Sequence, residues 1–236
     1  GMGVAKNLIK NEFDTTGFDL RNSCLKELKD SGGNVASSVE DIGKICDVVF
    51  IMVMNGNQVN DVVIKLSPGL KDDGTIIVTA TITPEEIRSA YKIAKKNNIK
   101  IIDSPVSGGL QGAHEGTLTL MSAADKNVFN NCKDILKSIS KDIFHVGKNI
   151  GDGQTVKASL RVFIGATFTA IFESLVLGSK AGIDGKTLYD VFSSSGVSSP
   201  LFKNCAKLIM DRKFENTGSH ICLLYTSDAA DDETSV

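Results

Sequence analysis

Apolar runs of strand length alternate with helical patterns over the first two thirds of the chain. The segment 47–54 (DVVFIMVM) and the segment that opens GTIIV at residue 74 are typical of strands buried on both faces of a parallel sheet. Further strands are predicted at 15–19, 100–103, 116–123 and 142–147, and helices at 1–13, 21–29, 84–96 and 128–140. This alternation predicts a doubly wound, Rossmann-like α/β domain over residues 1–150.

The pattern becomes all-helical from residue 151 onward. A glycine turn, GDG at 151–153, leads into a long apolar helix that extends to about residue 182. We expect a helical domain for substrate binding and oligomerisation over 151–220, truncated at its end. Residues 221–236 form a short acidic tail without apolar periodicity, and we expect this tail to be non-native. Because the chain opens in a helix with no strand before it, we expect a fragment whose sheet lacks its first strand.

The composition narrows the protein class. The 236 residues are 42% hydrophobic and 23% charged with a net charge of −2, so nothing indicates nucleic acid as a partner. Polar and charged residues interrupt the apolar runs before the ~20 residues that a membrane span needs, so we expect no membrane-spanning helix. The five cysteines show no CxxC pair and no histidine at ligand spacing. We therefore expect no metal site and a cytoplasmic location, although a missing start would also remove any targeting signal.

Lys157 is the strongest candidate for chemistry. At about 100° per residue, it shares a helix stripe with Arg161, Ile164, Phe168 and Phe172, so a cation begins a mostly apolar row. Desolvation and a second cation one turn away would both lower the pKa of this lysine, toward the range where an amine exchanges protons at neutral pH. The alternative is a lysine in the first turn whose amine reaches water.

Polar residues follow three predicted strands, where ligands of a doubly wound domain bind. Asp19 ends the first strand and lies 18 residues after Gly1, close to the ~20 expected between a phosphate-loop glycine and the acid that binds a ribose. Met54 and Asn55 end the next strand, and Thr81 ends the one after it. The alternatives are a turn or cap role for Asp19 and a simple Asn-Gly turn at Asn55.

Ser107, Gly108 and Gly109 form a third candidate. A hydroxyl followed by two glycines lets backbone N–H groups converge on an anion, which suits the carboxylate of a small acid. The alternative is an ordinary loop.

Four motifs together resemble the β-hydroxyacid dehydrogenase family, which includes 3-hydroxyisobutyrate, tartronate semialdehyde and L-threonate dehydrogenases. They are GMGVAKNL at the start, DSPVSGG at 103–109, GTLTLM at 116–121 and GDGQTVK at 151–157. The similarity covers residues 1 to about 220. The segments MVMN, ATITP and SSPLFKN most resemble the L-threonate dehydrogenase branch.

The resemblance implies oxidation of a small hydroxy acid by hydride transfer, with Lys157 as the general acid/base. Ser107, Gly108 and Gly109 would bind the substrate carboxylate. Many family members have Asn four residues after the lysine, whereas this chain has Arg161, which could hold a substrate carboxylate or block the usual arrangement. The resemblance also implies a homo-oligomer when the chain is full length.

On the cofactor side, the resemblance makes Gly1 the third glycine of a dinucleotide fingerprint and has Asn55 and Thr81 line the cofactor. An acid at Asp19 favours NAD because a carboxylate would repel a 2′-phosphate, while Arg21 close by also allows NADP. A rival of another class is a non-catalytic NAD(P)-binding or scaffold protein on the same fold. A binder has no need of an amine at Lys157, and this argues against it.

Overall fold

The computed structural model describes residues 1–213 and 215, which form two compact units divided between Ala158 and Ser159. The first unit contains every strand of the described chain, and the second is helical as far as it is described. The division falls inside one helix, a few residues after the predicted boundary at 150, and the domain limits stay a prediction. The predicted non-native tail at 221–236 lies outside the described residues.

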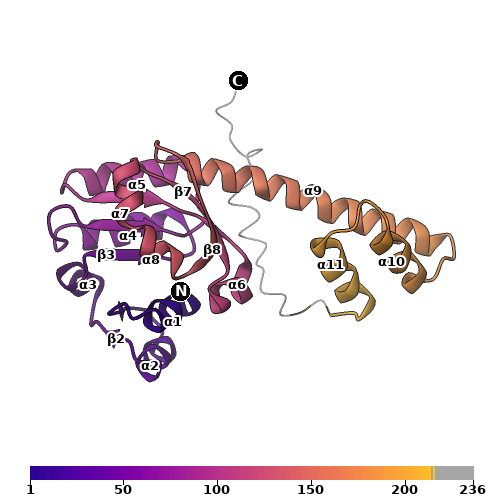
Figure 1. The fold of residues 1–236 in the computed structure, drawn as a ribbon, viewed down its shortest axis with the longest axis horizontal. Coiled ribbons are helices and arrows are strands. Elements are labelled where there is room, and N and C mark those ends of the chain that lie inside the picture. Colours follow the sequence, from indigo (N-terminus) through magenta and orange to yellow (C-terminus); the bar gives the residue numbers. More distant parts are fainter. Residues whose placement is uncertain (214, 216–236) are drawn as a thin grey trace. The chain divides into compact units, whose positions relative to one another are not determined.

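The first unit is built on a six-stranded mixed sheet (Figure 1). The order is β3-β4-β5-β7-β6, with β8 also paired to β7; β3, β4 and β5 are parallel, and β7 runs antiparallel to β5. The strands are β3 (Val48–Ile51), β4 (Thr75–Val78), β5 (Lys100–Asp103), β6 (Val106–Ser107), β7 (Leu118–Ala123) and β8 (Ser140–Gly147).

Two further strands, β1 (Thr16–Gly17) and β2 (Asn34–Val35), form a separate parallel pair. In the described chain, neither strand of this pair is hydrogen-bonded to a strand of the main sheet. In a doubly wound fold the first strand is central and would pair on both sides. The division into two sheets agrees with the expected Rossmann-like sheet that lacks this strand.

Helices cover both faces of the main sheet, as a doubly wound fold requires. On β4, Ile76 and Val78 belong to one buried cluster and Ile77 to another, because successive side chains of a strand point to opposite faces. The first cluster includes residues of α3, α4 and α5, and the second includes residues of α1, α7 and α8. The helices of this unit are α1 (Met2–Lys10), α2 (Asn22–Asp30), α3 (Val39–Ile45), α4 (Gly56–Leu66), α5 (Pro84–Lys95), α6 (Gly109–Glu115), α7 (Lys126–Asn131) and α8 (Lys133–Lys137).

The segment from β4 to α5 shows how local sequence fixes the sheet edge. Thr83 caps α5, because its hydroxyl accepts a hydrogen bond from the Glu86 N–H at 3.2 Å and the Glu86 carboxylate accepts one from the Thr83 N–H at 2.8 Å. Pro84 occupies the first turn, where its missing N–H costs nothing. The reciprocal cap fixes the loop that carries Thr81.

Two predicted elements differ clearly from the structure in their limits. β3 ends at Ile51 and alternates between buried and half-buried residues, so the prediction of a strand through Met54 buried on both faces was wrong. The reason is that β3 is an edge strand of its sheet and Met52 and Met54 lie exposed beyond its end. The helix predicted at 128–140 is two short helices, α7 and α8, which divide at Cys132.

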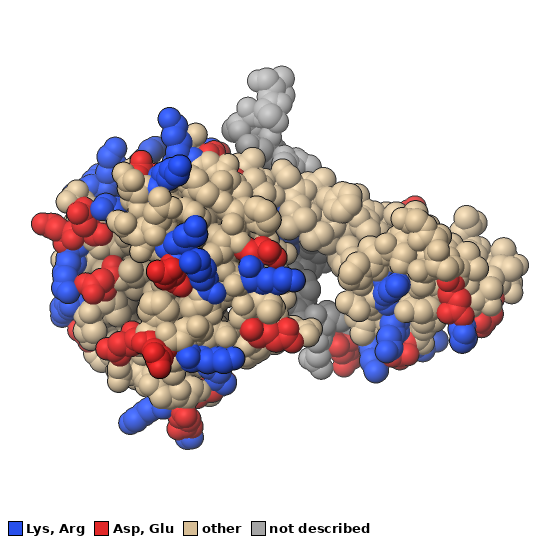
Figure 2. Space-filling model, in the orientation of Figure 1, with Lys and Arg blue, Asp and Glu red and all other residues tan. Residues whose placement is uncertain are grey.

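The second unit holds the later part of α9 (Asp152–Lys180), together with α10 (Gly185–Ser194) and α11 (Pro200–Met210). Its small core consists of Ile171, Phe202 and Ala206, with Tyr189 and Phe192 packed against Phe202. Figure 2 shows charged side chains of both signs scattered over the first unit, whereas the surface along α9 is almost free of them.

The sequence argument that polar residues interrupt every apolar run before it is long enough for a membrane span does not hold for α9. By length and composition α9 could cross a bilayer, since an 18-residue window has a mean hydropathy of 1.7 and only 6% of that window is buried. Its few charged residues do not lower this average enough to exclude a span. One such helix does not by itself indicate a membrane protein, because a core helix of a soluble protein passes the same test.

Candidate active site

Met54, Asn55 and Thr81 lie just beyond the carboxyl ends of the neighbouring parallel strands β3 and β4. The Met54 side chain is 53% exposed, and its N–H donates to the Gln58 Oε1 atom at 2.9 Å. Asn55 caps α4, because its Oδ1 accepts a hydrogen bond from the Gln58 N–H at 2.9 Å. Asn55 is therefore a helix cap and not a simple turn residue, and it begins α4 at the edge where a doubly wound fold binds its ligand.

Gly1 and Asp19 lie close together beside the small β1-β2 sheet. The Asp19 carboxylate lies near enough to the Gly1 end of α1 to interact with it electrostatically. Asp19 binds Arg21 through both oxygens: Oδ1 accepts from the Arg21 N–H at 2.9 Å and from Nε at 3.0 Å, and Oδ2 accepts from Nη2 at 3.0 Å. These bonds hold the pKa of Asp19 below its usual value. β1 ends at Gly17, so the expectation that Asp19 ends this strand was wrong, and its bonds to Arg21 fit the turn role.

Ser107, Gly108 and Gly109 form the turn from β6 into α6. Ser107 is half-buried and pairs with Thr119 of β7. Gly108 and Gly109 have φ values of 126° and 63°, in the left-handed region that other residues adopt at a cost. A Cβ on Gly109 would meet no atom within 4 Å, so the turn opens onto free space there. The glycines are therefore required by the backbone, whatever ligand the turn binds.

The glycine turn before α9 packs directly against the ends of β5 and β7. Gly151 has a φ of 107°, and its N–H donates to the Asp103 Oδ2 atom at 2.9 Å. A Cβ on Gly153 would lie 2.6 Å from the Met121 carbonyl oxygen and 2.8 Å from that of Asp103. Only glycine permits this approach, so the GDG sequence lets the first turn of α9 seat on the sheet.

Two buried polar residues that sequence reasoning missed, Asp103 and Gln154, join these segments. Asp103 is 0% and Gln154 1% exposed. The Asp103 Oδ2 atom also accepts from the Gln154 N–H at 3.2 Å, and its Oδ1 accepts from Gln154 Nε2 at 3.0 Å. The signal available in the sequence was position alone: Asp103 opens DSPVSGG, and Gln154 lies inside GDGQTVK.

The ionisation of Asp103 reflects two opposed effects. Burial raises the pKa of its carboxyl to about 6, while hydrogen bonds from Gln154, Gly151 and Gly153 act to lower it. The first effect is larger because the carboxyl is removed from water. The N-terminal end of α9 favours the ionised form, as do these donors. The site therefore holds an anion that ordinary changes of pH can protonate.

Lys157 lies one turn further along α9 and is buried, with 6% of its surface exposed. This agrees with the desolvation expected from the sequence. Arg161 follows one turn later on the same helix and belongs to the second unit. Burial lowers the pKa of the Arg161 guanidinium. Gln154, three residues before Lys157 on α9, is the residue bonded to the ends of β4 and β5 on both sides of Thr81.

A dinucleotide fits the residues at this edge of the sheet. Gly1 caps α1, and the N-terminus of a helix is a place where phosphate groups bind. Leu20, beside Asp19, is 91% exposed and Met54 is 53% exposed, so both offer apolar surface to a flat ring. Among the described residues, no group of three His, Cys, Asp or Glu side chains could hold a metal ion.

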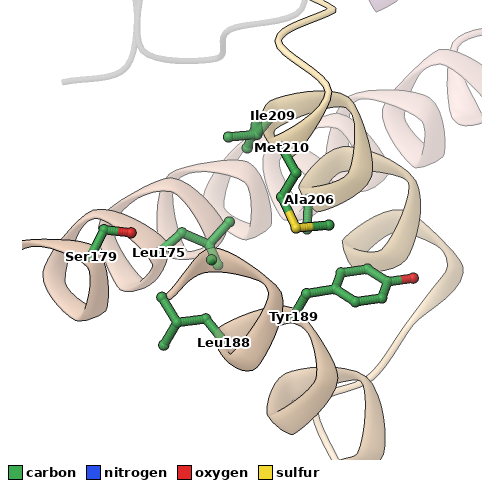
Figure 3. Close-up of a pocket in the computed structure, with 8 residues that line it drawn as sticks. Leu175, Ser179, Leu188, Tyr189, Ala206, Ile209 and Met210 are labelled. Atoms are coloured by element: carbon green, nitrogen blue, oxygen red, sulfur yellow. The ribbon is translucent and has the colours of Figure 1, made fainter. Parts of the chain in front are cut away.

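A cavity of about 190 Å³ lies in the second unit, between α9, α10 and α11 (Figure 3). Its polar side chains are the Ser179 hydroxyl and the Tyr189 phenol, and it contains neither a carboxylate nor an amine. Such a cavity lacks the acid/base and anion-binding groups of a reaction centre. Its remaining lining is apolar: Leu175, Gly185, Leu188, Ala206, Ile209 and Met210.

Two family models match the chain. Residues 1–147 match the NAD binding domain of 6-phosphogluconate dehydrogenase, and residues 151–224 match the NAD-binding domain of NADP-dependent 3-hydroxyisobutyrate dehydrogenase. An L-threonate dehydrogenase from Cupriavidus necator is 29% identical over 207 residues, which cover 86% of this chain and 70% of that protein. A probable mitochondrial 3-hydroxyisobutyrate dehydrogenase from Dictyostelium discoideum is 33% identical over 87% of this chain and 65% of that protein.

A solved structure has the same fold. The crystal structure of 3-hydroxyisobutyrate dehydrogenase from Salmonella typhimurium superposes with a TM-score of 0.86 at 25% sequence identity. The alignment covers 96% of this chain and 80% of that one. The chain thus spans about two thirds to four fifths of these proteins' lengths.

Proposed function

The chain belongs to the β-hydroxyacid dehydrogenase family, a group of NAD(P)-dependent enzymes, and on that premise we propose that it oxidises a small β-hydroxy acid with Lys157 as general acid/base. The proposed substrates are acids like L-threonate or 3-hydroxyisobutyrate, the compounds named in the similar proteins. NAD is the proposed cofactor because Asp19 carries a carboxylate where a 2′-phosphate would be repelled.

The observation that carries the proposal is the burial of Lys157 on a helix turn anchored to the sheet edge. Lys157 as a whole residue is 6% exposed, and the turn before it is bonded to Asp103 at the end of β5. Burial is one effect that favours the neutral form of an amine, and an amine that can lose its proton suits a general acid/base. A lysine whose side chain extended into water would be more exposed than this.

In the proposed reaction, NAD held at this edge would supply the acceptor for the hydride that leaves the carbinol carbon. Lys157 Nζ takes the hydroxyl proton as the C–H bond breaks and the carbonyl forms, so that charge does not build up on the oxygen. The N–H groups of Gly108 and Gly109 and the Ser107 hydroxyl would hold the substrate carboxylate and orient the carbinol carbon. Arg161, one turn after Lys157 on α9, is a further proposed substrate ligand.

The cofactor side of the proposal uses the carboxyl ends of β1, β3 and β4. Gly1 would let the pyrophosphate approach α1, and Asp19 would accept hydrogen bonds from the ribose hydroxyls. Met54, Asn55 and Thr81 would line the ribose and nicotinamide. The free thiols among the described cysteines support a reducing, cytoplasmic location.

A hydride-transfer assay on the full-length protein tests the proposal. The protein is mixed with NAD or NADP and a panel of L-threonate, 3-hydroxyisobutyrate and related acids, and reduced nicotinamide is followed by its absorbance. We expect turnover with one member of the panel and a higher kcat/KM with NAD than with NADP. NAD binding by calorimetry without turnover of any hydroxy acid would favour the rival, a non-catalytic NAD(P)-binding protein on the same fold.

A further inference from the structure

The side-chain amide of Gln154 is bonded on both sides of Thr81. Its Oε1 accepts a hydrogen bond from the Ile82 N–H at 3.1 Å, and its Nε2 donates to the Ala80 carbonyl oxygen at 3.0 Å. One planar amide therefore pairs with the carbonyl acceptor before Thr81 and with the N–H donor after it, much as a neighbouring strand would. This pairing fixes the peptide groups that flank Thr81 at the end of β4.

The same amide is tied to the anchor of α9. Gln154 Nε2 also donates to Asp103 Oδ1 at 3.0 Å, while Asp103 Oδ2 accepts from the N–H groups of Gly151 and Gln154. Every one of these groups is buried, so none can exchange its partner for water without loss. The end of β4, the end of β5 and the first turn of α9 therefore share one hydrogen-bonded network.

The requirement at position 154 is specific. The side chain must donate toward Ala80 and Asp103 and at the same time accept from the Ile82 N–H. Glutamate has the same shape but would place an oxygen against two acceptors, and methionine fills the space without any strong donor or acceptor. Glutamine alone among residues of this length meets both demands.

We infer that Gln154, acting with Asp103, is a positioning residue for the reaction: it holds the turn of α9 that carries Lys157 in fixed geometry against the Thr81 loop. Lys157 lies three residues after Gln154, on the same side of the helix. A shift of the helix at Gln154 therefore displaces the Lys157 amine relative to the loop that would line the cofactor. This inference rests on the proposed role of Lys157.

The test compares Gln154→Met with Ser122→Ala in the full-length protein. Ser122 is a matched control, because it is 0% exposed and its hydroxyl bonds to Ser104 at 2.8 Å, beside Asp103 but outside the network. We expect Gln154→Met to lower kcat by ~10- to 100-fold, the usual cost of a displacement of about 1 Å in a reacting group, while Ser122→Ala stays within about twofold of wild type. A kcat for Gln154→Met within about threefold of wild type would overturn the inference.

Amide hydrogen exchange without cofactor gives an independent readout. In Gln154→Met the Ile82 N–H loses its acceptor, so its exchange should become faster than in wild type, whereas in Ser122→Ala it should not change. Equal exchange at Ile82 in wild type and Gln154→Met would show that Gln154 does not hold the Thr81 loop, and would overturn the inference whatever the values of kcat. The readout does not depend on Lys157, so it separates a failure of this inference from a failure of the proposed function.

A double substitution covers the case in which Gln154→Met does not fold. In Gln154→Glu the new oxygen faces Asp103 Oδ1, and in Asp103→Asn the new amide nitrogen faces Gln154 Nε2, so each single change creates a mismatch. Together they restore the donor–acceptor pair between positions 103 and 154, while the glutamate oxygen still faces the Ala80 carbonyl. We therefore expect partial rescue, with a kcat for the double variant above the product of the two single effects. Strictly additive losses would show that the 103–154 pair does not act as a unit and would overturn the inference, and full activity of Lys157→Ala would instead defeat the proposed function.

Discussion

The stability of the protein should fall as pH rises through about 6, because the buried Asp103 carboxyl then loses its proton. Burial raises the pKa of this carboxyl from 3.8 to about 6, so the folded state binds its proton more tightly than the unfolded state does. The contribution to stability is therefore fully present below pH 3.8 and is lost as pH rises through about 6. The hydrogen-bond partners that bear on this pKa, Gly151, Gly153 and Gln154, do not titrate.

The magnitude follows from the two pKa values. The full displacement corresponds to about 3 kcal/mol, of which about 1 kcal/mol remains at pH 5 and almost none at pH 7.5. Asp103→Asn removes the titration and adds a loss that does not depend on pH, because the new amide nitrogen cannot accept from Gln154. Between pH 5 and 7.5, wild type should therefore lose about 1 kcal/mol more than the variant does.

Urea unfolding of both proteins at pH 5, 6 and 7.5 measures this difference. Each free energy of unfolding is obtained by linear extrapolation, and only the change with pH is compared. Parallel curves for wild type and Asp103→Asn would refute the reasoning, since they would mean that the Asp103 pKa does not change on folding. If wild type instead gained stability relative to the variant as pH rises, the N–H donors would outweigh burial.

Three further predictions concern other residues. Asp19→Ala in the full-length enzyme should reduce the preference of kcat/KM for NAD over NADP, because it removes a charge-assisted hydrogen bond of about 1.5–3 kcal/mol to the ribose; an unchanged ratio would make Asp19 a turn residue only. Gly153→Ala should lower Tm, because its Cβ would lie 2.6 Å from the Met121 carbonyl oxygen, whereas Gly165→Ala, with no atom within 4 Å, should stabilise α9 by up to about 1 kcal/mol. We propose that the full-length chain is a homo-oligomer that covers α9, so Phe163→Asp, at a side chain 70% exposed, should lower the mass measured by light scattering; an unchanged mass would exclude this face.

Elements with a strong local signal could be predicted from the sequence. β4 and α5 combine an uninterrupted apolar run with Pro84 and two acids in the first turn, and both lie where they were expected. β3 was predicted too long because Met52 and Met54 are apolar but lie beyond the strand, exposed at the edge of the sheet. An apolar residue marks a strand only where neighbouring strands bury it, and pairing is not visible in a local pattern.

Of the candidate site, only residues that stand out individually in the sequence could be predicted. Lys157 was singled out because a cation in an apolar stripe is unusual, and it is buried. Asp103 and Gln154 could not be found in the same way, because an acid at a strand end and a glutamine in a helix are common surface residues. Their role depends on contacts across 48 to 74 residues of chain, which the fold creates.

The most direct test of the account is the effect of Lys157→Ala on kcat and on NAD affinity in the full-length enzyme. If Lys157 transfers the hydroxyl proton, kcat should fall by ~10²–10⁴, while the Kd for NAD from calorimetry stays nearly unchanged. Lys157→Arg should not restore activity, because a guanidinium stays protonated at working pH and cannot act as the base. A kcat of Lys157→Ala equal to that of wild type on L-threonate, 3-hydroxyisobutyrate and related acids would contradict the account.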